Sequence, residues 1–187
     1  MVVSERVVGS PGWYRQPGTV CLNTDQQVAF NPADAQAFVD GYFQRLPLPV
    51  PGLHVQPAAQ AVVNLPEVVA ADPPPAGVFV VDQAPFPRIT INARVRWEWD
   101  FGDGGSAVSS WPGRAYDGLD PRTSPDHYVA HTYRARSAGQ RVRVTGVWTA
   151  SWQLAGFPGV RAVDGQVRRV SSQLLPVAAY GAVLTDN

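Results

Sequence analysis

Residues whose types could do chemistry gather between positions 100 and 131. Four of the five aspartates in this stretch are candidates for a Ca²⁺ site, because Ca²⁺ takes carboxylates and backbone carbonyls as ligands, but their spacing does not fit an EF-hand loop. A turn-forming role is the alternative, because aspartates accept hydrogen bonds from the backbone just downstream of them. We favour the turn role and predict no metal site. The four are Asp100, Asp103, Asp117 and Asp120.

Two histidines of this stretch, His127 and His131, stand four residues apart. Zinc would need two further ligands, and His54 is the only other histidine in the sequence. The single cysteine, Cys21, excludes an internal disulfide and a cysteine-based metal cluster. We therefore expect His131 to form a hydrogen bond near Tyr133 rather than to bind a metal.

A serine cluster with a nearby histidine and Asp126 has the residue types of a hydrolase. None of its members lies in a Gly-x-Ser-x-Gly sequence, and the pattern supplies no obvious oxyanion hole. We predict no catalytic residue, no cofactor and no enzymatic activity, and a hydrolase stays open as a rival class. The serines are Ser106, Ser109 and Ser110.

The element that positions these side chains is predicted by residues 94–105. Val95, Trp97 and Trp99 alternate with charged residues, the period of two that puts one face of a strand inward and the other into water. Residues 101–105 then contain glycines and an Asp-Gly pair, which tolerate the positive φ of a tight turn. We predict a strand that ends in a hairpin turn and has a tryptophan-rich inner face.

The composition also favours a mainly β fold. The chain has 187 residues, 17 Gly and 18 Pro, and its charged fraction of 16% is below the roughly 25% usual for soluble domains. Turn signals recur at the spacing of a sandwich. All 15 basic residues are arginines and 15 acids balance them, so net charge favours neither nucleic acid nor a membrane surface. We expect strands at 60–65, 67–71, 77–82, 88–99, 106–111, 127–134, 140–153, 162–172 and 177–184.

One helix is predicted before the strands, over about residues 32–46. Asn31 is a capping residue, Pro32 suits the first helical position, and an apolar stripe from Ala35 to Leu46 follows at helical spacing. A proline-rich connector ends it. We divide the chain into 1–57, an N-terminal segment with this helix and the connector, and 58–187, a β-sandwich on which the helix packs.

The order of motifs resembles the PKD (polycystic kidney disease) domain family. A tryptophan strand runs into the turn Trp99-Asp100-Phe101-Gly102-Asp103-Gly104, and about thirty residues later His131-Thr132-Tyr133 precedes another alternating strand. The resemblance covers about 65–172 and implies an immunoglobulin-like two-sheet β-sandwich. It also implies an extracellular role in contacts with proteins or polysaccharides rather than in catalysis.

A short N-terminal helix and a Leu-Pro-Leu-Pro connector precede the strand segment Asn64-Leu65-Pro66. With this order, the whole chain is similar to a group of actinobacterial secreted proteins that have a PKD-like core and no assigned role. The resemblance predicts a non-catalytic interaction module that is secreted or on the cell surface; a structural subunit of a surface appendage, with self-association, is the alternative. The sequence shows no signal peptide and no apolar run long enough to span a bilayer. From sequence, either the protein is cytosolic or its export signal lies outside this chain.

Contact residues are predicted in two places. Trp111, Arg114 and Tyr116 form an aromatic–arginine group at the start of a long loop, residues 112–126, of the kind found in binding hot spots and sugar-stacking sites; simple packing of the loop is the alternative. Arginines of two strands would crowd one outer face if the strands are neighbours, which suggests an anionic partner; a solvated face with local ion pairs is the alternative. These arginines are Arg94, Arg96, Arg141 and Arg143.

Overall fold

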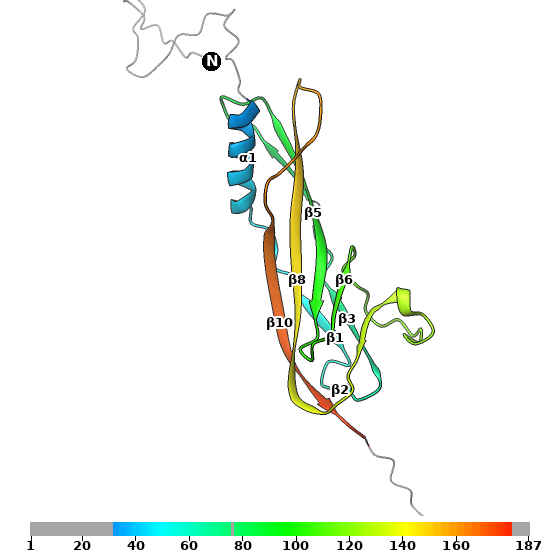
Figure 1. Ribbon diagram of the computed structural model, residues 1–187. Coiled ribbons are helices and arrows are strands. Elements are labelled where there is room, and N and C mark those ends of the chain that lie inside the picture. Colours follow the sequence, from blue (N-terminus) through cyan, green and yellow to red (C-terminus); the bar gives the residue numbers. More distant parts are fainter. Residues whose placement is uncertain (1–31, 76, 181–187) are drawn as a thin grey trace, which may run out of the picture.

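The structure, a computed structural model, describes residues 32–75 and 77–180 (Figure 1). Within them the fold is mainly β with one α-helix, α1 (Pro32–Arg45), as the sequence predicts, and one short 3-10 helix, η1 (Pro125–His127). Cys21, Asn31 and the end of the strand expected at 177–184 lie outside the described residues. The strands are β1 (Leu53–Gln56), β2 (Ala61–Val62), β3 (Pro66–Ala71), β4 (Val78–Val81), β5 (Ile89–Asp100), β6 (Ser106–Ser109), β7 (Val129–Thr132), β8 (Ser137–Leu154), β9 (Arg161–Ala162) and β10 (Val167–Ala178).

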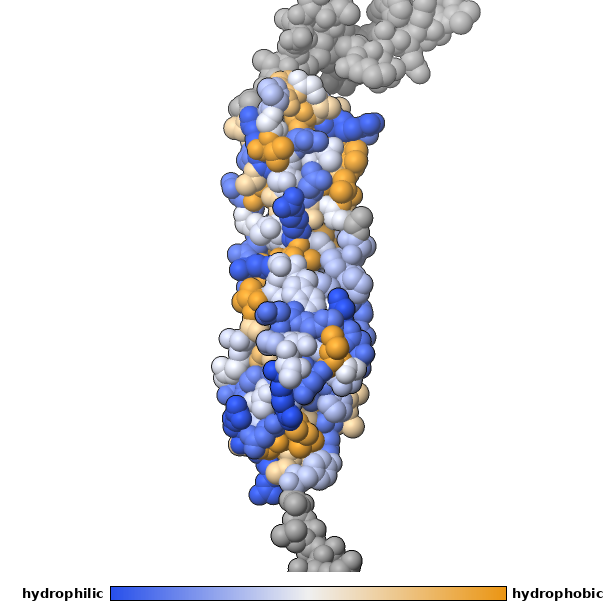
Figure 2. All heavy atoms as spheres, turned by 90° about the vertical axis from the view of Figure 1, so that its right-hand side faces the viewer, coloured by the Kyte–Doolittle hydropathy of each residue, from blue (hydrophilic) through white to orange (hydrophobic). Residues whose placement is uncertain are grey.

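The described residues form two sheets, and the larger one runs the length of an elongated molecule (Figure 1 and Figure 2). Its strand order is β2-β10-β8-β5-β4, with β6 also beside β5 and β9 also beside β8. The long strands β5 and β8 pair antiparallel from Ile89 opposite Leu154 to Asp100 opposite Arg143. The smaller sheet has the order β1-β3-β7.

One face of the large sheet is apolar from end to end, and two different elements cover it. On β5 the inward positions alternate as expected, from Ile89 and Ile91 at one end to Trp97 and Trp99 at the other. In the helix-covered half, α1 packs on Ile89, Ile91 and the β8 tryptophans. In the sheet-covered half, the small sheet packs on Trp97 and Trp99. We keep these two names below.

The core of the helix-covered half is built from the apolar stripe that the sequence predicts for α1. Ala35, Val39 and Phe43 are fully buried there, and Pro47 follows the helix end, where a proline stops further helical turns. Trp152 donates an indole hydrogen bond to Gln36 Oε1 at 3.1 Å, which fixes the helix on the sheet. In the sheet-covered half, Val55, Val69 and Val129 of the small sheet supply the facing layer.

Several strand predictions differ from the structure. Of the expected strands 60–65 and 127–134, only Ala61–Val62 and Val129–Thr132 are strands, and His127 lies in η1. β1 was not expected, because its four residues directly follow the proline-rich connector and alternate too briefly to be recognised. The expected strands 162–172 and 177–184 are replaced by the short β9 and one continuous strand, β10. Its pairing register shifts between Leu175 and Val177, so Pro176, which has no N–H to donate, lies in the irregularity instead of ending the strand.

Candidate functional site

The hairpin turn after β5 is held by its own aspartates. Asp100 Oδ1 accepts a hydrogen bond from the Gly102 N–H, and Asp103 Oδ1 accepts one from the Gly105 N–H, both at 3.0 Å. Gly102 and Gly104 have φ of 84° and 92°, which favours glycine at both positions. Asp100 and Asp103 therefore fill the turn-forming role expected of them.

The His-Thr-Tyr segment joins β7 to this turn. The buried Tyr133 hydroxyl donates to the Phe101 carbonyl at 3.0 Å, and His131 Nε2 lies 2.8 Å from Asp103 Oδ2. The His131 ring stacks on Phe101 with centroids 4.3 Å apart. Burial acts to raise the pKa of Asp103, but the hydrogen bonds from His131 and Gly105 outweigh it and lower the pKa below its usual value. This network ties the two sheets together at one end.

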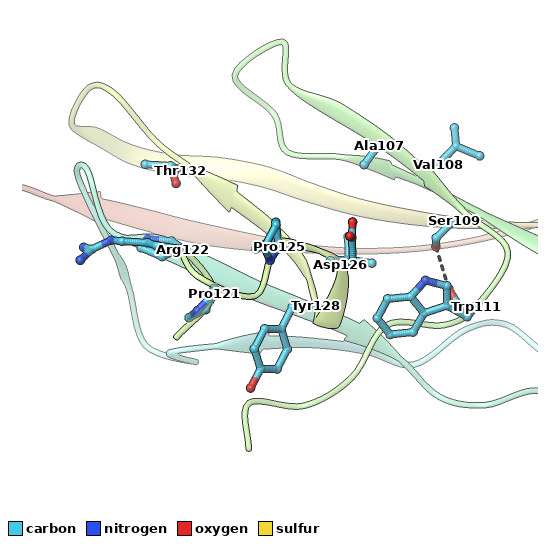
Figure 3. A pocket seen from close by; sticks show the side chains of 13 residues that line it. Ala107, Val108, Ser109, Trp111, Pro121, Arg122, Pro125, Asp126, Tyr128 and Thr132 are labelled. Atoms are coloured by element: carbon cyan, nitrogen blue, oxygen red, sulfur yellow. Dashed lines mark hydrogen bonds between the residues drawn. The ribbon is translucent and has the colours of Figure 1, made fainter. Parts of the chain in front are cut away.

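Trp111 is positioned by a relay that starts in the core. Trp99 Nε1 donates to Ser109 Oγ at 3.0 Å, and Ser109 Oγ donates to the Trp111 carbonyl at 2.7 Å. The relay fixes the backbone at the end of β6, and Trp111, half-buried and packed against the core of the sheet-covered half, lies on the wall of a pocket (Figure 3). In the described part of the chain, no serine hydroxyl is hydrogen-bonded to His127 or His131.

The long loop is organised around Asp117. His127 Nε2 lies 2.7 Å from Asp117 Oδ2, and the Tyr128 hydroxyl donates a short hydrogen bond to Oδ1. The hydrogen bonds from Tyr128 and His127 lower the pKa of Asp117 far below its usual range. Asp120 makes a second turn by accepting from the Arg122 N–H at 2.9 Å. These hydrogen bonds within the loop and to the residues just after it hold the loop in one conformation.

A pocket of about 500 Å³ opens between the edges of β6 and β7, with this loop as its outer wall (Figure 3). Trp111 and Tyr128 supply aromatic surface. Arg122 and Asp126 are exposed at its rim, and neither side chain has an ion-pair partner among the described residues. A volume in this range, with aromatic walls and a few polar groups, is typical of ligand sites. Its apolar lining also includes Ala107, Val108, Pro66, Pro121, Pro125, Val129 and Ala130.

The other two predicted contact residues of the loop lie away from this pocket. Tyr116 lines a separate hollow of about 470 Å³ on the far side of Pro66 and Pro121, and its ring stacks on Tyr128 at 5.9 Å. Arg114 pairs with Asp117 at 3.6 Å. The structure therefore divides the predicted group among two hollows and an ion pair.

The four predicted arginines do share the outer face of the large sheet, but acids separate them. Glu98 lies between two arginines: its Oε1 is 2.8 Å from Arg96, and its Oε2 makes a short contact with Arg168. Arg143 lies 3.7 Å from Asp100. Arg94 and Arg141 have no carboxylate within ion-pair distance in the described part of the chain. Local pairing thus neutralises part of this face.

The aspartates considered for calcium are divided between the hairpin turn and the long loop. Across residues 32–75 and 77–180, no three histidine, cysteine or acidic side chains form a group that could hold a metal ion. In the same residues, no helix is long and apolar enough to cross a membrane.

Sequence reasoning missed several residues of this region. No sequence pattern marks Tyr128, because it precedes the His-Thr-Tyr segment and belongs to no motif. Arg122 is not marked either, because its neighbours in sequence are turn-forming residues. Glu67 gave no signal at all: it lies on β3, facing the core, and is 2% exposed, with Oε1 lacking a hydrogen-bond partner. Burial raises the pKa of Glu67 to about 8.

Comparison with protein-family models, with curated proteins and with solved structures finds no match to this chain. The fold and the site therefore define its class by themselves: a mainly β protein with one docked helix and an aromatic pocket between two strand edges.

Proposed function

We propose that this chain is a non-catalytic interaction module, secreted or displayed at the cell surface, that contacts a protein or a polysaccharide through the pocket between β6 and β7. The observation that carries the proposal is the pocket itself. Its tryptophan is half-buried, is held by the Ser109 relay and lines the pocket, while Arg122 and Asp126 lie at the rim without ion-pair partners among the described residues. Aromatic anchors beside such polar groups are typical of recognition sites.

The PKD-type, immunoglobulin-like β-sandwich belongs to the same proposal. Three features support it: the strand–turn sequence of β5, the two sheets around a shared core in the sheet-covered half, and the Tyr133 bond to the Phe101 carbonyl. A tyrosine hydroxyl that returns to upstream backbone is typical of sandwich corners. Domains of this type serve contacts outside the cell, and a surface location follows from that resemblance.

Retention of the purified protein on insoluble cell-wall polysaccharide and on immobilised surface-protein extract tests the proposal. We expect retention on one of the two, reduced at least tenfold by Trp111→Ala, because loss of a central aromatic contact costs more than about 1–2 kcal/mol of binding. Arg122→Ala and Asp126→Ala should each weaken retention less.

Phe157→Ala is the matched control, because Phe157 is also a partly exposed aromatic residue but lies on the β8–β10 connection, outside the pocket. Thermal unfolding of each variant checks that the fold survives. No retention on either material, or equal retention of the wild type and Trp111→Ala, would remove the proposed function.

A further inference from the structure

One edge of the large sheet is bare over most of its length. β10 pairs with β8 along one side, from Val167 opposite Trp148 to Val177 opposite Ser137. On its other side the described residues include one pairing strand, β2, at Val177 and Ala178. Among the described residues, no backbone group hydrogen-bonds to residues 167–175 on that side. Strand edges of this kind offer a row of unpaired N–H and C=O groups to another strand.

The same edge is capped on both sides of this stretch. On one side, α1 reaches over it: Gln36 Nε2 donates to the Ala162 carbonyl at 3.0 Å, and Asp40 Oδ1 accepts from the Asp164 N–H at 2.8 Å. On the other side, β2 covers it. The unpaired stretch is nine residues long, and because Val167 and Leu175 at its ends are buried, its open part is the seven residues 168–174. The strands at other edges, β4, β6 and β7, have four residues each. Figure 1 shows β10 on the outside of the long sheet below α1.

We propose that this edge binds a second copy of the chain, by antiparallel pairing of β10 with β10 about a two-fold axis at Ser171. A two-fold axis makes each residue face its mirror position, so the axis fixes every pair. Ser171 is the midpoint of residues 168–174, and an axis there pairs all seven open residues. The two large sheets then form one continuous sheet.

The charges of β10 are compatible with this register. Arg168 faces Leu174 of the second copy, and Arg169 faces its Gln173, so no like charges stand opposite each other. An axis at position 168 or 169 would instead place an arginine against itself. Both arginines are already held within their own copy, Arg168 by Glu98 and Arg169 by the carbonyls of Leu46 and Leu48.

Apolar surface next to the edge favours the same pairing. Val170 and Leu174 are 49% and 60% exposed on the outer face of β10. In the proposed dimer Leu174 lies against the aliphatic part of Arg168 of the second copy, and Val170 lies beside Ser172 of that copy. No proline interrupts residues 167–175, and the nearest one, Pro176, lies at the irregularity just beyond them.

A cysteine scan of neighbouring positions tests the register directly. In a Cys21→Ser background, Ser171→Cys places two thiols opposite each other at the axis, within the 4.4–6.8 Å Cα separation of a disulfide. Ser172→Cys, one residue away and more exposed, places them about 8 Å apart and is the control. Under mild oxidation we expect Ser171→Cys to give a covalent dimer in high yield and Ser172→Cys to give at least tenfold less.

Sedimentation equilibrium of the unmodified chain supplies the second measurement. We expect a reversible species of twice the 20.2 kDa mass. Ser171→Lys should shift it to monomer by placing two ammonium groups at the axis, whereas Ser106→Lys, on the edge strand β6, should leave it unchanged. Three outcomes would overturn the proposal: a strict monomer across a 100-fold range of protein concentration, equal crosslinking of the two cysteine variants, or open-ended polymers. Retention through Trp111 is independent of all three outcomes.

Discussion

The two halves of this molecule bury the same face of one sheet by different means. In the helix-covered half, the core residues are all apolar, and a single helix supplies the cover. In the sheet-covered half, the cover is a second sheet, and the buried layer includes Glu67 and the Tyr133 hydroxyl. The aromatic pocket and the ionisable network of His131 with Asp103 also belong to this half.

This difference separates the interactions that mainly stabilise the fold from those that fix the positions of particular groups. Apolar burial has no preferred direction, and in the helix-covered half it is supplemented by the hydrogen bonds that Gln36 and Asp40 of α1 form. Hydrogen bonds and buried carboxyls are directional and costly when unpaired, so the sheet-covered half fixes the turn, the loop and Trp111 at some expense. We expect the loss of a buried tryptophan to have a large, pH-independent effect in either half, and pH-dependent effects of mutation to arise only in the sheet-covered half.

Trp152→Ala should have the largest effect. It removes a fully enclosed indole and the hydrogen bond to Gln36, so we expect a loss of about 3–5 kcal/mol in the free energy of unfolding. Denaturant unfolding at neutral pH measures this loss. Native-state hydrogen exchange should also show α1 losing protection before β7.

Trp99→Ala is the matched control in the sheet-covered half, because Trp99 is equally buried on the same face. It should cost a similar free energy but leave α1 protected. If both variants release α1 to the same extent, the two cores are one cooperative unit and the comparison is wrong.

Glu67→Met should stabilise the protein above about pH 8. A carboxyl whose pKa rises from 4.5 to about 8 on folding contributes its full stability below pH 4.5, and this contribution is lost as the pH rises through 8. Met is neutral at every pH and of similar length. The difference between variant and wild type should therefore grow by about 3–5 kcal/mol between pH 4.5 and 8 and then level off.

Chemical denaturation across pH 4–9 measures this difference. Thr145→Val serves as the control, because Thr145 is the other buried polar residue among the described ones and does not titrate. A pH-independent difference for Glu67→Met would mean that Glu67 is not buried as its neutral form.

Tyr133→Phe should cost about 1 kcal/mol, which is smaller because only one neutral hydrogen bond is lost and the ring stays in place. The effect should be nearly the same from pH 5 to 8, as judged by denaturant unfolding. Tyr42→Phe, on α1 in the helix-covered half, is the control and should change stability by less than about 0.5 kcal/mol. A loss above about 3 kcal/mol would show that the hydroxyl organises the hairpin turn as a whole.

The sequence predicts local features of both halves and few of the contacts between elements. The α1 stripe, the alternation in β5 and the aspartate turn follow from spacing and from glycine chemistry, which are local. The hydrogen-bond partners of Ser109 and Asp117 depend on which chain segments folding brings together, and residue spacing in the sequence does not predict them. Glu67 was missed for the same reason: a lone acid in a short strand predicts an exposed side chain, and only the packing of the two sheets buries it.

The predicted binding residues show the same limit. Trp111 was selected for its type and its position at a loop start, and it lies on the pocket wall. The arginines were selected on the assumption that β5 and β8 are neighbours, which holds. The prediction of one basic surface did not include Arg168. This arginine of β10 also contacts Glu98, so the acid lies between arginines of two strands. An anionic partner stays a prediction for Arg94 and Arg141.

Asp103→Asn should have the smallest effect and the opposite pH dependence to Glu67→Met. The asparagine keeps an oxygen for the Gly105 N–H but loses the charge beside His131, so we expect a cost of about 0.5–1 kcal/mol near pH 6. The folded-state pKa of Asp103 lies below its usual value, so this contribution is present above the unfolded pKa of 3.8 and is lost as the pH falls through the folded pKa. Denaturant unfolding at pH 2 and pH 6 measures the stability difference without and with this contribution.

Glu67 loses its contribution to the free energy of unfolding as the pH rises, and Asp103 loses its own as the pH falls. The sheet-covered half should therefore be most stable in weak acid. A variant of either residue that shifted the stability of the helix-covered half instead would break the separation on which the comparison rests.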